Sequence, residues 1–122
     1  MKPRPDILPS VTREVITACG SIFIGISFDE DLKPFEVFAT MGKSGNCNAS
    51  YINGIAIAIS IGLRSGTNYK DYVKYLSGIR CSSVKFNGKG KTVYSCVDAI
   101  AKAIDEEVKN PVVLDYIRSY YA

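Results

Sequence analysis

Apolar and small residues alternate from Ser21 to Phe28, with Ile22, Ile24 and Ile26 on one side of the segment. A period of two predicts a β-strand with one buried face. Strand-forming runs flank this segment, and a charged turn, residues 29–34, separates the second run from the third. We therefore expect an antiparallel meander with strands at residues 11–18, 21–28 and 35–41.

The segment from Ala49 to Leu63 carries no charge and repeats its apolar side chains at helical spacing. This predicts a buried helix, since a membrane span needs about 20 apolar residues. Ile57 and Ile61 fall outside the main apolar stripe, so we expect the helix to be covered on a second side by another copy of the chain. The stripe itself consists of Ala49, Ile52, Ile55, Ala56, Ile59 and Leu63.

The remaining chain alternates between helical patterns and one hairpin signal. Asn87-Gly88 between two short extended runs predicts a hairpin within residues 79–94. Asn68, Ser95 or Asp98, and Asn110 are suitable helix N-caps, and Pro111 suits a first helical position. The further helices are expected at residues 69–77, from 95 or 98 to 108, and 112–121.

These elements predict an α+β fold, an antiparallel β-meander followed by packed helices and a small hairpin. We expect one domain over residues 1–122, with a proline-rich extended arm at 1–10 and a helical tail at 111–122. The hydrophobic fraction of 47% supports a real core. No apolar leader follows Met1, so we expect a cytoplasmic protein, in the host cytoplasm if the chain is encoded by a phage.

The net charge and the amino-acid composition limit the classes of function that the chain could have. The net charge of +3 permits an anionic small ligand but does not suggest DNA binding. The sequence has no histidine, which excludes histidine acid–base chemistry and histidine-activated nucleophiles. We expect a binding protein that is not an enzyme, with no cofactor and no membrane partner.

A polar loop precedes the uncharged helix. Gly42-Lys43-Ser44 resembles the end of a phosphate-binding loop, but Val37 occupies the position where that motif needs glycine. Two interpretations stay open: a polar turn, or an anion site at a helix N-terminus. The candidate ligand residues in this loop are Lys43, Ser44 and Asn46.

Other residues could contact a phosphate-bearing ligand. Arginine binds phosphate with two parallel hydrogen bonds, and aromatic rings can stack on a base. Most of the lysines and arginines could equally well be ordinary solvated surface charges without a ligand. The candidates that we retain are Arg64, Arg80, Phe86, Asn87 and Arg118.

The chain has four cysteines, Cys19, Cys47, Cys81 and Cys96, and no C-x-x-C pair. In a cytosolic protein such cysteines are thiols or metal ligands rather than disulfides. Their wide spacing favours buried structural thiols. An all-thiolate zinc site remains open if the four meet in space.

Six motifs together resemble the TSCPD domain, which is known mainly from the C-terminus of adenosylcobalamin-dependent ribonucleotide reductases. The resemblance extends over about residues 11–108. The family's Cys-Pro-Asp stands here as Cys96-Val97-Asp98, and its Arg-Cys-Pro as Arg80-Cys81-Ser82. The resemblance implies an accessory module related to ribonucleotide reductase. The motifs are C-G-S-I-F-I at 19–24, P-F-E-V-F at 34–38, G-K-S-G-N-C at 42–47, L-R-S-G at 63–66, G-I-R-C at 78–81 and S-C-V-D-A-I-A at 95–101.

The chain is also similar in length, layout and aromatic C-terminal tail to the first family of Thoeris anti-defence proteins of phages. That similarity implies a homo-oligomeric sponge, which sequesters a cyclic nucleotide immune signal, a cyclic ADP-ribose isomer, without cleaving it. It assigns no residue, so the candidate ligand residues depend on their chemistry alone. The alternative function is a cysteine-based metal-binding accessory module.

Overall fold

The computed structural model describes residues 1–42, 47–88 and 91–122, apart from the side chain of Cys47. It confirms the α+β fold. A three-stranded antiparallel sheet in the order β1-β2-β3 is followed by helices and a two-stranded hairpin, β4-β5. The elements are β1 (Ser10–Thr17), β2 (Gly20–Phe28), β3 (Pro34–Met41), α1 (Cys47–Arg64), α2 (Tyr69–Leu76), β4 (Lys85–Phe86), β5 (Thr92–Val93), α3 (Cys96–Lys109) and α4 (Pro111–Tyr121).

The alternation in β2 builds the centre of the core. Ile22, Ile24 and Ile26 are fully buried, as their spacing predicted, and the long helix α3 packs across this sheet. Ile100 and Ile104 of α3 are also fully buried. The meander and α3 therefore share one hydrophobic core.

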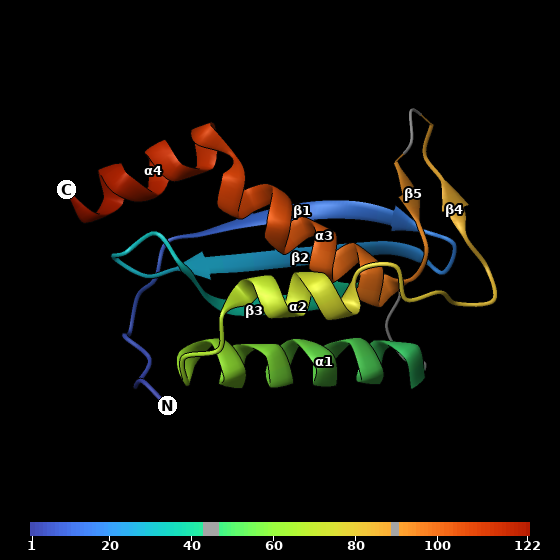
Figure 1. Ribbon diagram of the computed structural model, residues 1–122, viewed down its shortest axis with the longest axis horizontal. Coiled ribbons are helices and arrows are strands. Elements are labelled where there is room, and N and C mark those ends of the chain that lie inside the picture. The colour runs from blue at the N-terminus through green and yellow to red at the C-terminus, as the bar shows by residue number, and fades with distance from the viewer. Residues whose placement is uncertain (43–46, 89–90) are drawn as a thin grey trace.

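Helix α1 packs against β3, one of the two edge strands of the meander (Figure 1). Ser60 bonds both backbone groups of Val37: its hydroxyl accepts from the Val37 N–H at 2.9 Å and donates to the Val37 carbonyl at 3.0 Å. A side chain thus occupies the position that a fourth strand would take, and the helix covers an edge that could otherwise pair with another chain.

The predicted helix caps are confirmed at three starts. Asn68 and Asn110 accept the N–H of the residue two positions on, and Ser95 accepts the N–H of Asp98. Ser95, rather than Asp98, is the cap of α3, because Asp98 lies within the first turn of the helix and its own N–H is the group that Ser95 accepts. No helix in the described ranges is long and apolar enough to cross a membrane.

Candidate functional site

Three cysteines from separate segments lie near one another at one end of the molecule. Cys19 lies in the β1–β2 turn, Cys81 in the segment after α2, and Cys96 is the first residue of α3. The side chain of Cys19 interacts with those of both Cys81 and Cys96. The turn, the segment after α2 and the start of α3 all lie at the same end as the hairpin (Figure 1, right). We call Cys19, Cys81 and Cys96 the thiol cluster.

The thiols of the cluster differ in exposure. Cys96 is buried, Cys81 is half-buried and Cys19 is exposed. The prediction of buried structural thiols therefore holds for Cys96 and is wrong for Cys19, which lines an open cavity of about 370 Å³. The remaining cysteine, Cys47, is the first residue of α1, and its side chain lies outside the described part of the chain.

The neighbouring thiols also change the acidity of Cys19. Desolvation by surrounding protein atoms raises the pKa of the Cys19 thiol, and Cys96 and Cys81 raise it further by charge repulsion and hydrogen bonding. Without a bound cation, the Cys19 thiol therefore holds its proton more tightly than a free cysteine would. A metal ion reverses this preference, since a coordinating thiol is deprotonated.

Asp98 fixes two of the segments that carry the cluster. Its fully buried carboxylate accepts the N–H of Gly78 at 2.7 Å and that of Tyr94 at 3.0 Å, and forms an ion pair with Lys102 at 2.9 Å. A backbone hydrogen bond from the Cys81 N–H to the Tyr94 carbonyl joins the same two segments. Asp98 thus holds the segment before Cys81 against the start of α3.

Thr17 holds the third segment. Its hydroxyl donates to the Gly20 carbonyl at 2.8 Å, accepts the Cys19 N–H at 3.1 Å, and lies 3.6 Å from the Cys96 sulfur. Gly20 has a φ of 119°, a conformation that favours glycine. The tight turn therefore places Cys19 beside the N-terminus of α3.

Within the described ranges, no group of three or more histidine, cysteine, aspartate or glutamate side chains is already arranged to hold a metal ion. A structural zinc site takes four ligands in a tetrahedron. The described thiols number three, and Cys47 is the chain's only further cysteine.

The predicted nucleotide-binding residues fall into separate places. Lys43, Ser44 and Asn46 lie outside the described residues. Three others lie near the hairpin, where Phe86 is 76% exposed and the Asn87 amide donates to the Ile16 carbonyl. The Arg80 guanidinium lies 5.2 Å from the centre of the Tyr94 ring.

The last two candidates lie at the opposite end. Arg64 ends α1 and Arg118 lies on α4, both distant from the hairpin along the long axis (Figure 1). Arg64 donates to the Lys2 carbonyl, and Arg118 pairs with Asp115 at 3.1 Å on an exposed helix face. One chain therefore does not bring all five described candidates into a single site.

Sequence reasoning missed the anchoring role of Asp98, which it considered only as a helix cap. The signal that could have revealed this role is the position of Asp98 in the shared S-C-V-D motif, two residues after Cys96.

The prediction from sequence also missed three lysines that line a cavity between α1 and α2: Lys2, Lys33 and Lys70.

Comparison with known proteins agrees with the TSCPD motifs. A vitamin B12-dependent ribonucleotide reductase from Bradyrhizobium diazoefficiens is 30% identical over 69 residues, which cover 57% of this chain and 6% of the reductase. The chain thus matches only a small part of that enzyme. No solved structure matches. The family model of the TSCPD domain matches residues 1–108, so this chain belongs to the TSCPD domain family.

Proposed function

We propose that this protein is a metal-holding accessory module in which cysteine thiolates bind zinc. The observation that carries the proposal is the interaction of the Cys19 thiol with both Cys81 and Cys96, which brings three segments distant in sequence together. Buried apolar packing alone would not place the exposed Cys19 thiol against two others. We expect Cys47 to supply the fourth ligand of an all-thiolate tetrahedron.

The anchors around the cluster support this function. Asp98 and Thr17 hold the backbone within three residues of each cysteine through part-buried hydrogen bonds. Such supporting bonds commonly orient the ligands of a metal site. Zinc would link the β1–β2 turn to α3 and the segment after α2, and its binding energy would add to the stability of the fold.

Zinc analysis of protein purified without added metal tests the proposal. We expect about one zinc ion per chain, as a single four-thiolate site requires. Cys81→Ser and Cys96→Ser should each lower the zinc content severalfold and lower the melting temperature. Ser83→Ala is the matched control, since it alters the same segment but removes no thiol.

Cobalt provides a second measurement. Metal-free wild-type protein titrated with Co²⁺ under reducing conditions should develop the thiolate-to-cobalt absorption of a tetrahedral site, and Cys47→Ser should weaken that absorption. Zinc content near zero together with no thiolate absorption would contradict the proposal.

The similarity to a ribonucleotide reductase suggests the partner of this module. We propose that it acts with a reductase encoded elsewhere. A pull-down with the tagged protein should recover the reductase of the same cell, and the zinc-free Cys96→Ser variant should recover less. Equal recovery by a tagged unrelated protein would argue against this partnership.

Sequestration of a cyclic nucleotide, such as a cyclic ADP-ribose isomer, is a second candidate function and would serve phage counter-defence against Thoeris. The exposed Phe86 ring on the hairpin favours it, because an uncovered aromatic can stack on a base. Protein incubated with the isomer and then heated should release it intact, since we propose binding without catalysis. Recovery of cleaved ligand would show an enzyme instead.

A further inference from the structure

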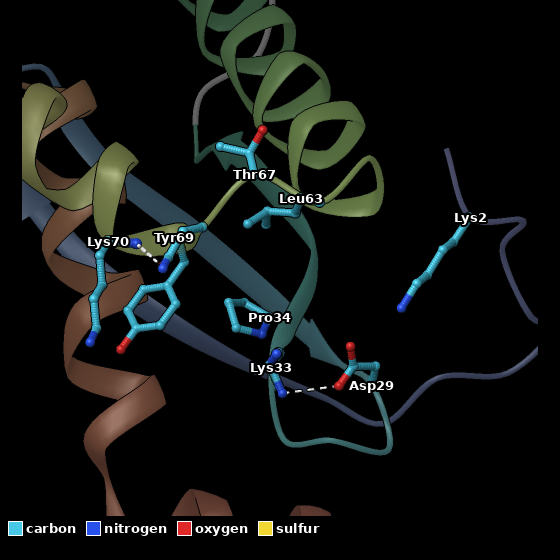
Figure 2. Close-up of a pocket in the computed structure, with 10 residues that line it drawn as sticks. Lys2, Asp29, Lys33, Pro34, Leu63, Thr67, Tyr69 and Lys70 are labelled. Atoms are coloured by element: carbon cyan, nitrogen blue, oxygen red, sulfur yellow. Dashed lines mark hydrogen bonds between the residues drawn. The ribbon is translucent and has the colours of Figure 1, made fainter.

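A cavity of about 430 Å³ lies where α1 ends and α2 begins. This place is at the opposite end of the molecule from the thiol cluster (Figure 1). Figure 2 shows its walls: the N-terminal arm, the β2–β3 turn, and the connection from α1 into α2. The lining residues are Lys2, Asp29, Lys33, Pro34, Leu63, Gly66, Thr67, Asn68, Tyr69 and Lys70.

Positive charge dominates this cavity. Lys2, Lys33 and Lys70 come from three different segments, and among the ion pairs of the described residues none involves these lysines. Asp29 is the one carboxylate in the lining, and its oxygen already accepts two backbone N–H groups of its own turn. Three lysines and one aspartate thus line the cavity, which leaves an excess of positive charge for an anion.

The position of Lys2 is fixed by Arg64. The Lys2 N–H donates to the Arg64 carbonyl at 2.8 Å, and the Arg64 Nε donates to the Lys2 carbonyl at 3.0 Å. The Arg64 guanidinium also lies 5.5 Å from the centre of the Phe35 ring. Arg64 therefore acts as a positioning residue that holds the arm in place, and Lys2 extends from the arm toward Asp29 and Pro34 (Figure 2).

The rest of the lining suits the uncharged part of a ligand. Pro34 is buried, Leu63 and Tyr69 are half-buried, and the Tyr69 ring lies on the side opposite Lys2 (Figure 2). The volume falls in the range of about 300–1,000 Å³ that small-ligand pockets occupy. The cavity thus combines separated cations with an apolar and aromatic wall.

We propose that this cavity binds a small molecule carrying two or more phosphate charges, of the nucleoside diphosphate class. Lys2, Lys33 and Lys70 would contact the phosphates, and Tyr69 the uncharged part. The site uses no cysteine, so it is independent of the metal-holding function.

Calorimetric titration with ADP at low ionic strength tests this inference. We expect wild-type protein to bind ADP, with an affinity that falls as the salt concentration is raised, because the three lysines are exposed and salt screens exposed charges. The combined variant K2Q/K33Q/K70Q should bind at least about tenfold more weakly, because it loses three positive charges that would contact the phosphates.

A control variant that loses the same number of positive charges distinguishes ADP binding in the cavity from non-specific attraction of ADP to a positively charged protein. K74Q/K85Q/K91Q removes three exposed lysines outside the cavity and should keep affinity within about twofold. Circular dichroism should show both variants folded.

Three results would overturn the inference. They are no detectable ADP binding by wild-type protein at low salt, equal weakening in the two lysine variants, or unchanged binding in K2Q/K33Q/K70Q. None of them would bear on the zinc content.

Discussion

Asp98 is a buried carboxylate that connects two backbone segments and a lysine. Asp98→Asn keeps the shape of the side chain but replaces one acceptor oxygen with a donor and removes the charge that faces Lys102. Because an amide NH₂ cannot accept a backbone N–H, we expect the free energy of unfolding to fall by about 2 kcal/mol. Urea denaturation measures the change.

Asp105→Asn provides the control for this prediction. Asp105 lies on the same helix and pairs with Lys109 at the same i,i+4 spacing, but both side chains are far more exposed than Asp98. Loss of this ion pair should lower the free energy of unfolding far less than Asp98→Asn does, because solvent screens the exposed charges. Equal losses in the two variants would contradict the anchoring role of Asp98.

Cys19 should make the stability of the metal-free protein depend on pH. Desolvation, followed by repulsion from Cys96 and Cys81, raises the pKa of Cys19 in the folded state above its value in the unfolded chain. The folded state therefore binds the proton more tightly, and this stabilisation is complete below the unfolded pKa and is lost as pH rises through the folded pKa.

Denaturation of the metal-free protein between pH 7 and pH 10 checks this dependence. Other groups titrate in the same range, so the useful quantity is the difference between wild type and Cys19→Ser. We expect the wild type to lose more stability than the variant as the pH rises. A smaller loss in the wild type would show that Cys19 is stabilised as a thiolate.

At the scale of elements, the contact between α1 and β3 depends on one hydroxyl. Ser60→Ala would leave the Val37 N–H and carbonyl without the partner that they have in the folded chain. Val37 is almost fully buried, so we expect a loss of about 1–3 kcal/mol in the free energy of unfolding. Thermal and urea unfolding would measure it.

Ser50→Ala is the matched substitution on the same helix. Ser50 is exposed, so its change should stay within about 0.5 kcal/mol of wild type. If Ser60→Ala proves equally mild, water replaces the hydroxyl and α1 does not depend on this bond.

The elements themselves were largely predictable because local patterns determine them. The alternating isoleucines of β2, the uncharged stripe of α1 and the caps Asn68 and Asn110 all act within a few residues of the chain. The start of β3 and both ends of α1 differ from the predicted bounds by one or two residues, as frayed ends usually do.

At the scale of the whole molecule, local pattern was insufficient for the sites. The thiol cluster joins segments that are far apart in sequence, and only the packing of α3 across the meander brings Cys96 to the turn that carries Cys19. The lysine-lined cavity likewise depends on how Arg64 fixes the arm. The spacing of cysteines or lysines along the chain contains no signal for either arrangement.

The outer side of α1 gives the last prediction. Tyr51, Ile57 and Ile61 are 69%, 52% and 50% exposed, on a helix that carries no charge from Ala49 to Leu63. Exposed apolar surface of this kind commonly marks an interaction site. We expect a second copy of the chain to cover it, so that the protein is at least a dimer in light scattering coupled to size-exclusion chromatography.

Ile57→Glu combined with Ile61→Glu should convert the assembly to monomers, because a charged side chain buried in an apolar contact costs several kcal/mol unless it is paired. Val112→Glu is the control: Val112 is 77% exposed on α4, away from α1, and its change should leave the assembly intact. A wild-type monomer at high protein concentration would rule out this interface. An oligomer that survives both glutamates would place the contact on another face.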